Sequence, residues 1–262
     1  MKSNNHEHKE NNIEEVSKSV LITGANKSIG LESARQLLQK GYYVYLGSRS
    51  LENGLNALKE LKSEGFTNVE VIQLDVTDQQ SVNAARAELG KKTDVLDVLI
   101  NNAGISGTLP QSALDADISN FKNVFDTNLY GVVSVTQAFL DLLRKSPEPR
   151  IVNVSSSVGS LSLQSNPDWR FYHYAKFAVY ASSKAALNMY TVTLAYELRD
   201  TAFKVNAIDP GYTKTDFNHH KGTGTIEDAA ARVVKYALID NNGPTGKYFS
   251  EETNPETGEV PW

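Results

Sequence analysis

Residues 19–40 read SVLITGANKSIGLESARQLLQK, and this stretch decides the fold. Its first five residues are mostly apolar or β-branched, which is typical of a buried strand. A loop bounded by Gly24 and Gly30 follows directly. Beyond the loop, leucine and alanine recur at the spacing of one helix face over residues 31–40. The stretch therefore predicts a strand, a glycine loop and a helix.

The same alternation of apolar runs and amphipathic segments continues to residue 249. The expected strands are residues 19–23, 42–46, 69–74, 98–100, 151–154, 203–207 and 247–249. The expected helices are residues 31–40, 51–64, 79–89, 121–144, 177–198 and 226–238. Such alternation predicts βαβ units and, with right-handed crossovers, a three-layer, doubly wound parallel α/β sheet. No linker interrupts residues 19–250, so we expect one domain (19–262) after a flexible polar tail (1–18).

The composition excludes several classes of function. The 262 residues include no cysteine, which removes disulfide frameworks, thiolate nucleophiles and Cys-ligated metal sites. The net charge of −5 disfavours nucleic-acid binding, and no apolar run approaches the roughly 20 residues of a membrane helix. The polar start lacks the apolar segment of a signal peptide, so we expect a cytoplasmic protein. His6 and His8 could hold a metal weakly, but a solvated tail is the simpler interpretation, and no metal site is predicted.

The loop after the first strand lies where such a sheet binds its ligand, outside the carboxyl ends of the strands. Its glycines permit close approach to a pyrophosphate, and the following helix offers free N–H groups. An NAD-binding protein of this kind usually carries an acidic residue after the second strand. This chain carries Arg49 there and Lys27 in the loop. Both cations suit a 2′-phosphate, so we predict NADP(H) over NAD(H), with ordinary solvated charges as the alternative.

Two Tyr/Lys pairs, each four residues apart, are candidates for acid–base chemistry. Tyr180 and Lys184 fall within a predicted helix and so share one face. A neighbouring ammonium lowers the pKa of a phenol, which helps it exchange a proton near neutral pH. Tyr172 and Lys176 have the same spacing and are a rival pair. Serines at positions 155–157 end a predicted strand at the same edge, where a hydroxyl can polarise a carbonyl.

Seven ordered motifs make the chain resemble the short-chain dehydrogenase/reductase family over residues 19–249. The motifs are TGANKSIG (23–30), DV (75–76), NNAG (101–104), TNLYG (127–131), VNVSS (152–156), YASSKAAL (180–187) and PGYTKT (210–215). The resemblance implies a single-domain Rossmann fold and an NAD(P)-dependent oxidoreductase that acts on alcohol or carbonyl groups.

The resemblance implies four catalytic residues. Tyr180 would be the general acid/base, and Lys184 would lower the pKa of Tyr180 and bind the nicotinamide ribose. Ser156 would polarise the substrate carbonyl, and Asn128 would hold a water that relays protons to Lys184. Only Tyr180 lies in the family's YASSKAAL motif, which favours it over Tyr172.

The cofactor-binding residues that the resemblance implies lie in the glycine loop, after the next strands and in the PGYTKT motif. Asp75 would bind the adenine amino group, with Val76 packing near it. Asn101 would line the cofactor together with the following residues. The full set is Gly24, Asn26, Lys27, Ser28, Ile29, Gly30, Arg49, Asp75, Val76, Asn102, Ala103, Gly104, Tyr180, Lys184, Pro210, Gly211, Thr213 and Thr215.

The chain departs from the family pattern in two places. Ser28 replaces the middle glycine of the loop, which a serine can do at negative φ. The 24-residue spacing from Ser156 to Tyr180 exceeds the usual family spacing and indicates an aromatic-rich insertion over residues 162–177. Similar insertions occur in the family's carbonyl-reductase branch. We expect packing to be the main role of these aromatic residues, with substrate wall and subunit interface as alternatives.

The segment where the family places its substrate lid, residues 216–225, is short and polar here. It indicates an open, permissive pocket, and its His219 and His220 are expected to be exposed rather than zinc ligands. We therefore predict an NADPH-dependent carbonyl reductase with a small-molecule substrate. The alternatives are an NAD(P)-linked alcohol or sugar dehydrogenase and a catalytically silent dinucleotide sensor. The substrate and the choice between monomer and homo-oligomer stay open.

Overall fold

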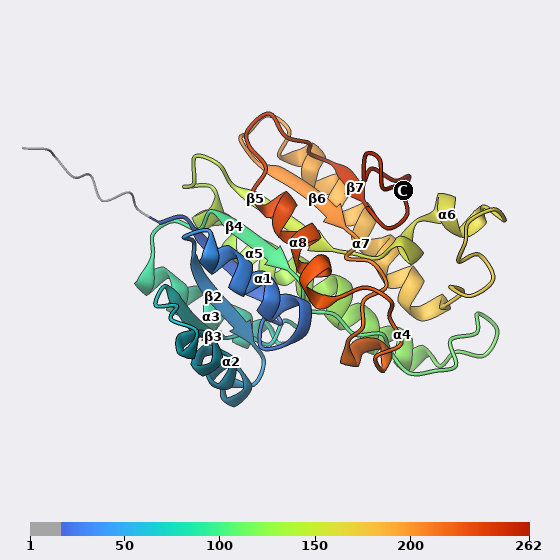
Figure 1. Ribbon diagram of the computed structural model, residues 1–262, viewed down its shortest axis with the longest axis horizontal. Coiled ribbons are helices and arrows are strands. Elements are labelled where there is room, and N and C mark those ends of the chain that lie inside the picture. Colours follow the sequence, from blue (N-terminus) through green and yellow to red (C-terminus); the bar gives the residue numbers. More distant parts are fainter. Residues whose placement is uncertain (1–16) are drawn as a thin grey trace, which may run out of the picture.

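The computed structural model describes residues 17–262, which form a seven-stranded parallel sheet with the order β3-β2-β1-β4-β5-β6-β7 (Figure 1). The strands are β1 (Ser19–Thr23), β2 (Tyr43–Ser48), β3 (Val69–Gln73), β4 (Val98–Asn101), β5 (Arg150–Val154), β6 (Lys204–Ile208) and β7 (Lys247–Phe249). The strand order reverses between β1 and β4, which is the switch point where open α/β sheets bind ligands. The predicted fold class and all seven strands are confirmed.

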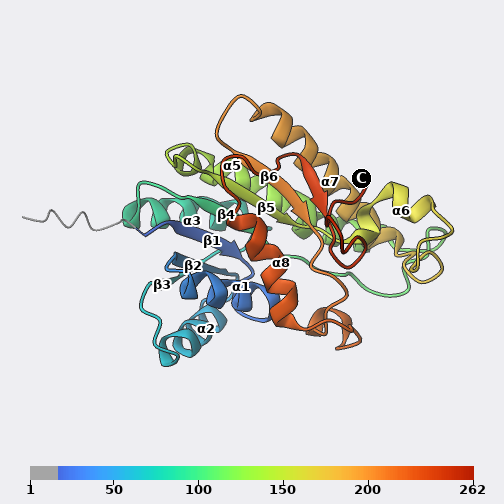
Figure 2. The same ribbon diagram turned by 45° about the horizontal axis from the view of Figure 1, so that its top comes forward.

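Two layers of helices cover the sheet. The helices are α1 (Ser28–Gln39), α2 (Leu51–Ser63), α3 (Gln79–Lys92), α4 (Ile118–Phe125), α5 (Gly131–Leu143), α6 (Leu161–Ser165), α7 (Ala178–Glu197) and α8 (Ile226–Ala237). Figure 2 shows α1 and α8 on one face of the sheet and α3, α5 and α7 on the other. Helix α2 packs on the α1 side, since its buried side chains belong to the same core cluster.

Strand β1 shows why the central strands are apolar throughout. Val20 and Ile22 point into the core under α1 and α8, whereas Leu21 points into the core under α5 and α7. All three side chains are fully buried. Because successive residues of a strand face opposite sides, a sheet covered on both faces needs an unbroken apolar run. Each such side chain contributes about 1.5–3 kcal/mol through burial.

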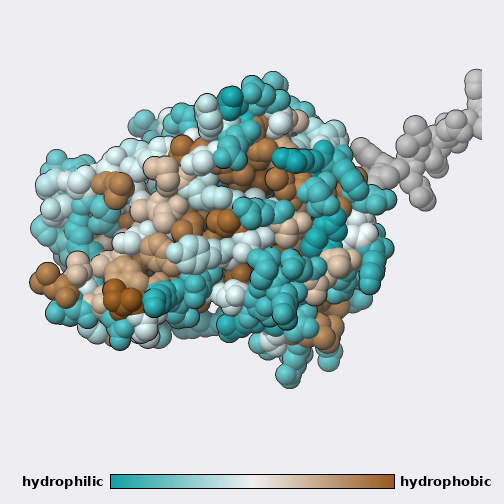
Figure 3. Space-filling view, turned by 180° about the vertical axis from the view of Figure 1, so that it is seen from behind, coloured by the Kyte–Doolittle hydropathy of each residue, from teal (hydrophilic) through white to brown (hydrophobic). Residues whose placement is uncertain are grey.

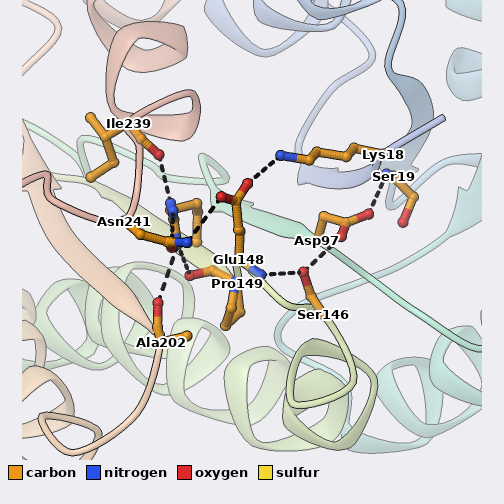
Figure 4. A network of polar contacts seen from close by, with 10 residues as sticks. Lys18, Ser19, Asp97, Ser146, Glu148, Pro149, Ala202, Ile239 and Asn241 are labelled. Carbon is orange, nitrogen blue, oxygen red and sulfur yellow. Dashed lines mark hydrogen bonds and ion pairs between the residues drawn. The ribbon is translucent and has the colours of Figure 1, made fainter. Parts of the chain in front are cut away.

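The edge of the sheet opposite the carboxyl ends is closed by a polar network (Figure 4). Arg150 is 2% exposed and donates to three main-chain oxygens and to Asn241 Oδ1 (2.9 Å). The buried Asp97 carboxylate accepts from the Ser19 N–H and the Ser146 hydroxyl, both at 2.7 Å. These bonds join the starts of β1, β4 and β5 to the segment after α8.

Of the expected polar tail, residues 1–16 with His6 and His8 lie outside the described residues. Lys18 accepts a backbone hydrogen bond from Tyr43 (2.8 Å) and pairs with Glu148, so residue 18 already belongs to the sheet edge.

Seen from behind, the surface mixes hydrophilic and hydrophobic patches (Figure 3). Helix α7 contributes exposed Met189 and Tyr196 side chains. Between residues 17 and 262, no helix has both the length and the apolarity needed to cross a membrane.

Candidate active site

The four predicted catalytic residues meet at the carboxyl edge of the sheet. Ser156 comes two residues after the end of β5, and Tyr180 and Lys184 lie in the first two turns of α7. Asn128 approaches from the segment between α4 and α5. A Cβ atom added at Gly104, in the loop after β4, would lie 3.4 Å from Asn128 Oδ1 and 3.6 Å from Lys184 Nζ. The loop after β4 is therefore in contact with this group.

Asn128 is held by a break in the helix that carries it. The sequence predicts one helix over residues 121–144, but a π-helical turn (Asp126–Tyr130) separates α4 from α5. The side chain of Asn128 is fully buried: Oδ1 accepts from the Ile105 N–H (2.9 Å), and Nδ2 donates to the Ile105 carbonyl (2.9 Å) and to Ser183 Oγ (3.0 Å). The π turn thus carries a fully hydrogen-bonded side chain, and such turns are frequent at functional sites. The expectation of an uninterrupted helix is wrong.

Lys184 is buried below Tyr180. Its ammonium donates to the Val154 carbonyl (2.8 Å) and lies 5.7 Å from the centroid of the Tyr180 ring. Burial lowers the pKa of Lys184 to about 8, against the opposing charge of Asp209. The lysine is thus largely charged at neutral pH, but its charge is sensitive to its surroundings.

The expected lowering of the Tyr180 pKa by Lys184 is not what the structure shows. Burial raises the pKa of Tyr180 above its usual value, and the negative charge of Asp209 raises it further. A hydrogen bond with Ser156 lowers the pKa but does not outweigh these effects. The Lys184 ammonium is held at the Val154 carbonyl, so desolvation of the phenol dominates. At neutral pH Tyr180 is therefore a protonated phenol that can donate a hydrogen bond or a proton.

The rival pair belongs to another part of the molecule. Tyr172 and Lys176 both precede α7, so they do not share a helix face there. The Lys176 ammonium lies 3.9 Å from the Tyr172 ring centroid and donates to the Gln164 carbonyl (2.6 Å). These contacts tie the insertion together.

The insertion is largely packed on itself. Trp169 is buried with Leu163 and Ala175, and Phe171 contacts the indole edge-on at 5.6 Å between centroids. Tyr174, by contrast, is 78% exposed. The expectation that packing is the main role of these aromatic residues holds for Trp169 and Phe171 but not for Tyr174.

The glycine loop fits closely against the loop after β4. Gly24 has a φ of +63°, and a Cβ there would lie 3.1 Å from Ala103 Cα. A Cβ at Gly30 would lie 2.5 Å from the Gly24 carbonyl oxygen and 2.6 Å from Asn102 Nδ2. Asn102 Nδ2 in turn donates to the Thr23 carbonyl (2.9 Å). Only glycine fits these positions, and the bare backbone they leave is what close approach of a pyrophosphate requires.

Ser28 adopts a left-handed backbone conformation, which the sequence did not predict. Its φ is +54°, so the expectation of a negative φ is wrong. The loop enters α1 through the left-handed conformation that the family's usual glycine adopts freely. In a serine, this conformation is strained because Cβ comes too close to the backbone.

Replacing Ser28 with glycine is expected to raise the free energy of unfolding by up to about 1 kcal/mol, since the relief of strain exceeds the entropy cost of glycine. Urea denaturation measures this change. Ser119→Gly, in the first turn of α4, is the matched control and should lower stability by about 0.5–1 kcal/mol. Equal destabilisation by both variants would contradict the assigned backbone strain.

Arg49 and Asp75 line one surface cleft beyond the glycine loop. Asp75 Oδ1 accepts from the Thr77 N–H (3.0 Å) and hydroxyl (2.8 Å), and Val76 packs against Gly131. The other predicted cation is engaged elsewhere, because the Lys27 ammonium pairs with Asp216 at 2.9 Å. The structure therefore does not bring Lys27 and Arg49 together in one phosphate-binding site.

The PGYTKT segment borders the site on the side of β6. Gly211 has a φ of +87°, Thr213 and Thr215 are buried, and the Pro210 carbonyl accepts from Arg232 (2.7 Å). These contacts fix the loop next to the end of β6.

The lid segment is less open than the sequence indicates. Phe217, which sequence reasoning missed, contacts the Tyr180 ring edge-on at 5.4 Å between centroids. His219 and His220 are exposed, as expected, and His220 pairs with Asp216 at 3.0 Å. An aromatic residue just after a PGYTKT motif is the signal that could have located Phe217.

Comparison with known proteins decides the family. A family model described as short chain dehydrogenase matches residues 18–225. The chain belongs to this family. This short-chain dehydrogenase is 36% identical to (-)-isopiperitenone reductase of Mentha piperita, over 91% of this chain and 98% of that one. It is 32% identical to salutaridine reductase of Papaver bracteatum, over 87% and 93% of the two chains.

A similar solved structure is that of NADPH-bound carbonyl reductase from chicken fatty liver. The TM-score is 0.79 at 28% identity, and the match covers 94% of this chain and 99% of that one. The protein is accordingly an NAD(P)-dependent short-chain oxidoreductase.

Proposed function

We propose that the protein is an NADPH-dependent carbonyl reductase that converts a small ketone or aldehyde to an alcohol. The observation that carries the proposal is the meeting of Ser156, Tyr180, Lys184 and Asn128 beside the loop after β4. NADPH, when bound, supplies the hydride for the carbonyl carbon. The relatives include proteins named as reductases, and the similar solved structure is named as an NADPH-bound carbonyl reductase, which supports the same reaction class.

In this proposal the protein's own residues handle the oxygen atom and its proton. The hydroxyls of Ser156 and Tyr180 donate hydrogen bonds to the carbonyl oxygen, which stabilises the negative charge that develops on it. Tyr180 then gives its proton to the oxygen. Its raised pKa keeps that proton in place until the alkoxide, a much stronger base, forms. Lys184 holds the nicotinamide ribose, and Asn128 orders the water that returns a proton.

The preference for NADPH rests on the residue after β2. Arg49 is exposed in the cleft that also holds Asp75, where an NAD-binding protein would carry an acid. A guanidinium binds a phosphate through two parallel hydrogen bonds. The glycine loop offers the matching pyrophosphate site. Lys27 would join the 2′-phosphate only by leaving Asp216.

A panel of ketones, aldehydes and alcohols, assayed with NADPH, NADH and their oxidised forms, tests the proposal. We expect NADPH oxidation with at least one ketone or aldehyde and slower turnover with NADH. Turnover confined to alcohols with NAD would favour the alcohol or sugar dehydrogenase. Tight binding of NADPH without turnover of any substrate would favour the silent sensor. The expected cytoplasmic location stays a prediction.

A further inference from the structure

A buried carboxylate that this mechanism does not use lies under the site. Asp209 follows the last residue of β6 and is 3% exposed. Its Oδ1 accepts from the Gly211 N–H (3.0 Å) and its Oδ2 from the Ser250 hydroxyl (2.7 Å), while Ser157 adds a further side-chain hydrogen bond. Every one of these partners donates and so stabilises the ionised carboxylate, whereas burial acts the other way and raises the pKa of Asp209 above its usual value.

The strand register places Asp209 next to the catalytic group. Ile208 of β6 is in register with Val154 of β5, whose carbonyl holds the Lys184 ammonium. The Ser155 N–H donates to the Ile208 carbonyl (2.7 Å), so the chain segments around Ser156 and Asp209 leave the sheet side by side. Neighbouring strands lie about 4.8 Å apart. The backbone at Asp209 thus lies beside the segment that carries Ser156, and its carboxylate is close enough to raise the pKa of Lys184.

We propose that Asp209 is a positioning residue that acts as the buried counter-charge of Lys184, keeping the lysine and Tyr180 protonated for carbonyl reduction. The assignment of Lys184 and Tyr180 to the reaction rests on the proposed function. Burial lowers the pKa of Lys184, and the negative charge of Asp209 raises it. For Tyr180, burial and the charge of Asp209 both raise the pKa. A charge buried without compensation would lose its proton instead.

The other charged or titratable groups near Asp209 come from several elements. They are Tyr180 and Lys184 of α7, Tyr248 of β7, Glu252 of the C-terminal segment and Arg232 of α8. Glu252 is paired with Arg170 at 2.8 Å, and Arg232 is bound to the Pro210 carbonyl. Of these groups, Lys184 is the cation that is buried, so we expect the charge of Asp209 to stabilise the protonated form of Lys184 most.

Asp209→Asn keeps the shape and removes the charge. Reduction requires protonated Tyr180 and protonated Lys184, and the pKa of each falls when the carboxylate is lost. The basic limb of the kcat/KM profile for NADPH-dependent reduction is therefore expected to move down by about one pH unit relative to the wild type. Asp97→Asn is the matched control, because Asp97 is also buried and accepts from one N–H and one serine hydroxyl at the opposite edge (Figure 4).

The titration of Lys184 is also measured directly, by NMR of protein labelled at lysine ¹³Cε, with Lys184→Met used for assignment. This measurement needs neither substrate nor cofactor, so it separates this proposal from the proposed function. We expect the pKa of Lys184 to fall by about one unit in Asp209→Asn and to stay in place in Asp97→Asn.

If Asp209→Asn does not fold, the reciprocal experiment replaces it. The pKa of Asp209, followed by its carboxyl ¹³C signal, should rise in Lys184→Met because the interaction is mutual. An unchanged Lys184 titration in folded Asp209→Asn, or an unchanged Asp209 titration in Lys184→Met, overturns the proposal. Equal shifts in Asp209→Asn and Asp97→Asn would also overturn it, since they would reflect a general loss of structure.

Discussion

Tyr180→Phe is expected to reduce kcat for carbonyl reduction by a factor of about 10³ or more while NADPH affinity changes less than about threefold. The phenylalanine keeps the ring that packs on Phe217 but removes the only proton that the proposed reaction gives to the alkoxide. General acid catalysis by a positioned side chain contributes about 10²–10⁴ in rate, and loss of a hydrogen bond to the developing charge adds to this. Steady-state kinetics and fluorescence titration of NADPH give the two quantities.

Tyr172→Phe is the matched control for this prediction. It makes the same chemical change in the rival Tyr/Lys pair, which packs within the insertion. We expect kcat to stay within about twofold of the wild type. Greater damage from Tyr172→Phe than from Tyr180→Phe would mean that the acid has been assigned to the wrong tyrosine.

Arg49→Asp is expected to raise the Kd for NADPH by a factor of about 100 and to leave the Kd for NADH within about threefold. Loss of a charge-assisted hydrogen bond costs about 1.5–3 kcal/mol, and each 1.4 kcal/mol is a factor of ten in affinity. The new carboxylate also repels the 2′-phosphate, but it suits the free ribose hydroxyls of NADH. Fluorescence titration with both cofactors measures the change.

Arg144→Asp controls for the change in net charge. Arg144 is likewise exposed, but it follows α5 on the side of the molecule away from the Arg49 cleft, so the cofactor preference should stay the same. A similar loss of NADPH affinity in both variants would indicate a long-range charge effect. An unchanged preference in Arg49→Asp would remove the argument that this arginine binds the phosphate. Lys27→Met then measures whether the lysine contributes despite its ion pair with Asp216.

The strands were predictable because both faces of the sheet are covered. Burial on both sides demands unbroken apolar runs, and such runs are visible in any window of the sequence. The break at Asn128 was not visible, because residues 121–144 carry an apolar pattern that suits one long helix. The Asn128 side chain at the break is hydrogen-bonded to Ile105 and Ser183, which are distant in sequence, so a local pattern does not reveal these contacts.

The candidate site was predictable where a motif brings its residues together, as in the YASSKAAL segment. Asp209 was missed because one acidic residue at the end of a strand has no periodicity of its own. Its only signal is a charged side chain that directly follows the buried strand β6 and precedes Pro210 and Gly211. The positive φ of Ser28 was also missed, because a serine in a sequence does not reveal that the loop holds it in the left-handed conformation.

The π turn at residues 126–130 has a consequence for alignments of this protein with its relatives. A π turn amounts to one residue more than a regular helix would hold over the same rise. In a relative one residue shorter here, the helix would run straight, and the asparagine would rotate by about 100° around the helix axis. Such a relative could align at every motif and still turn its amide away from the positions of Ile105 and Ser183. The length of this segment is therefore as diagnostic as the asparagine itself.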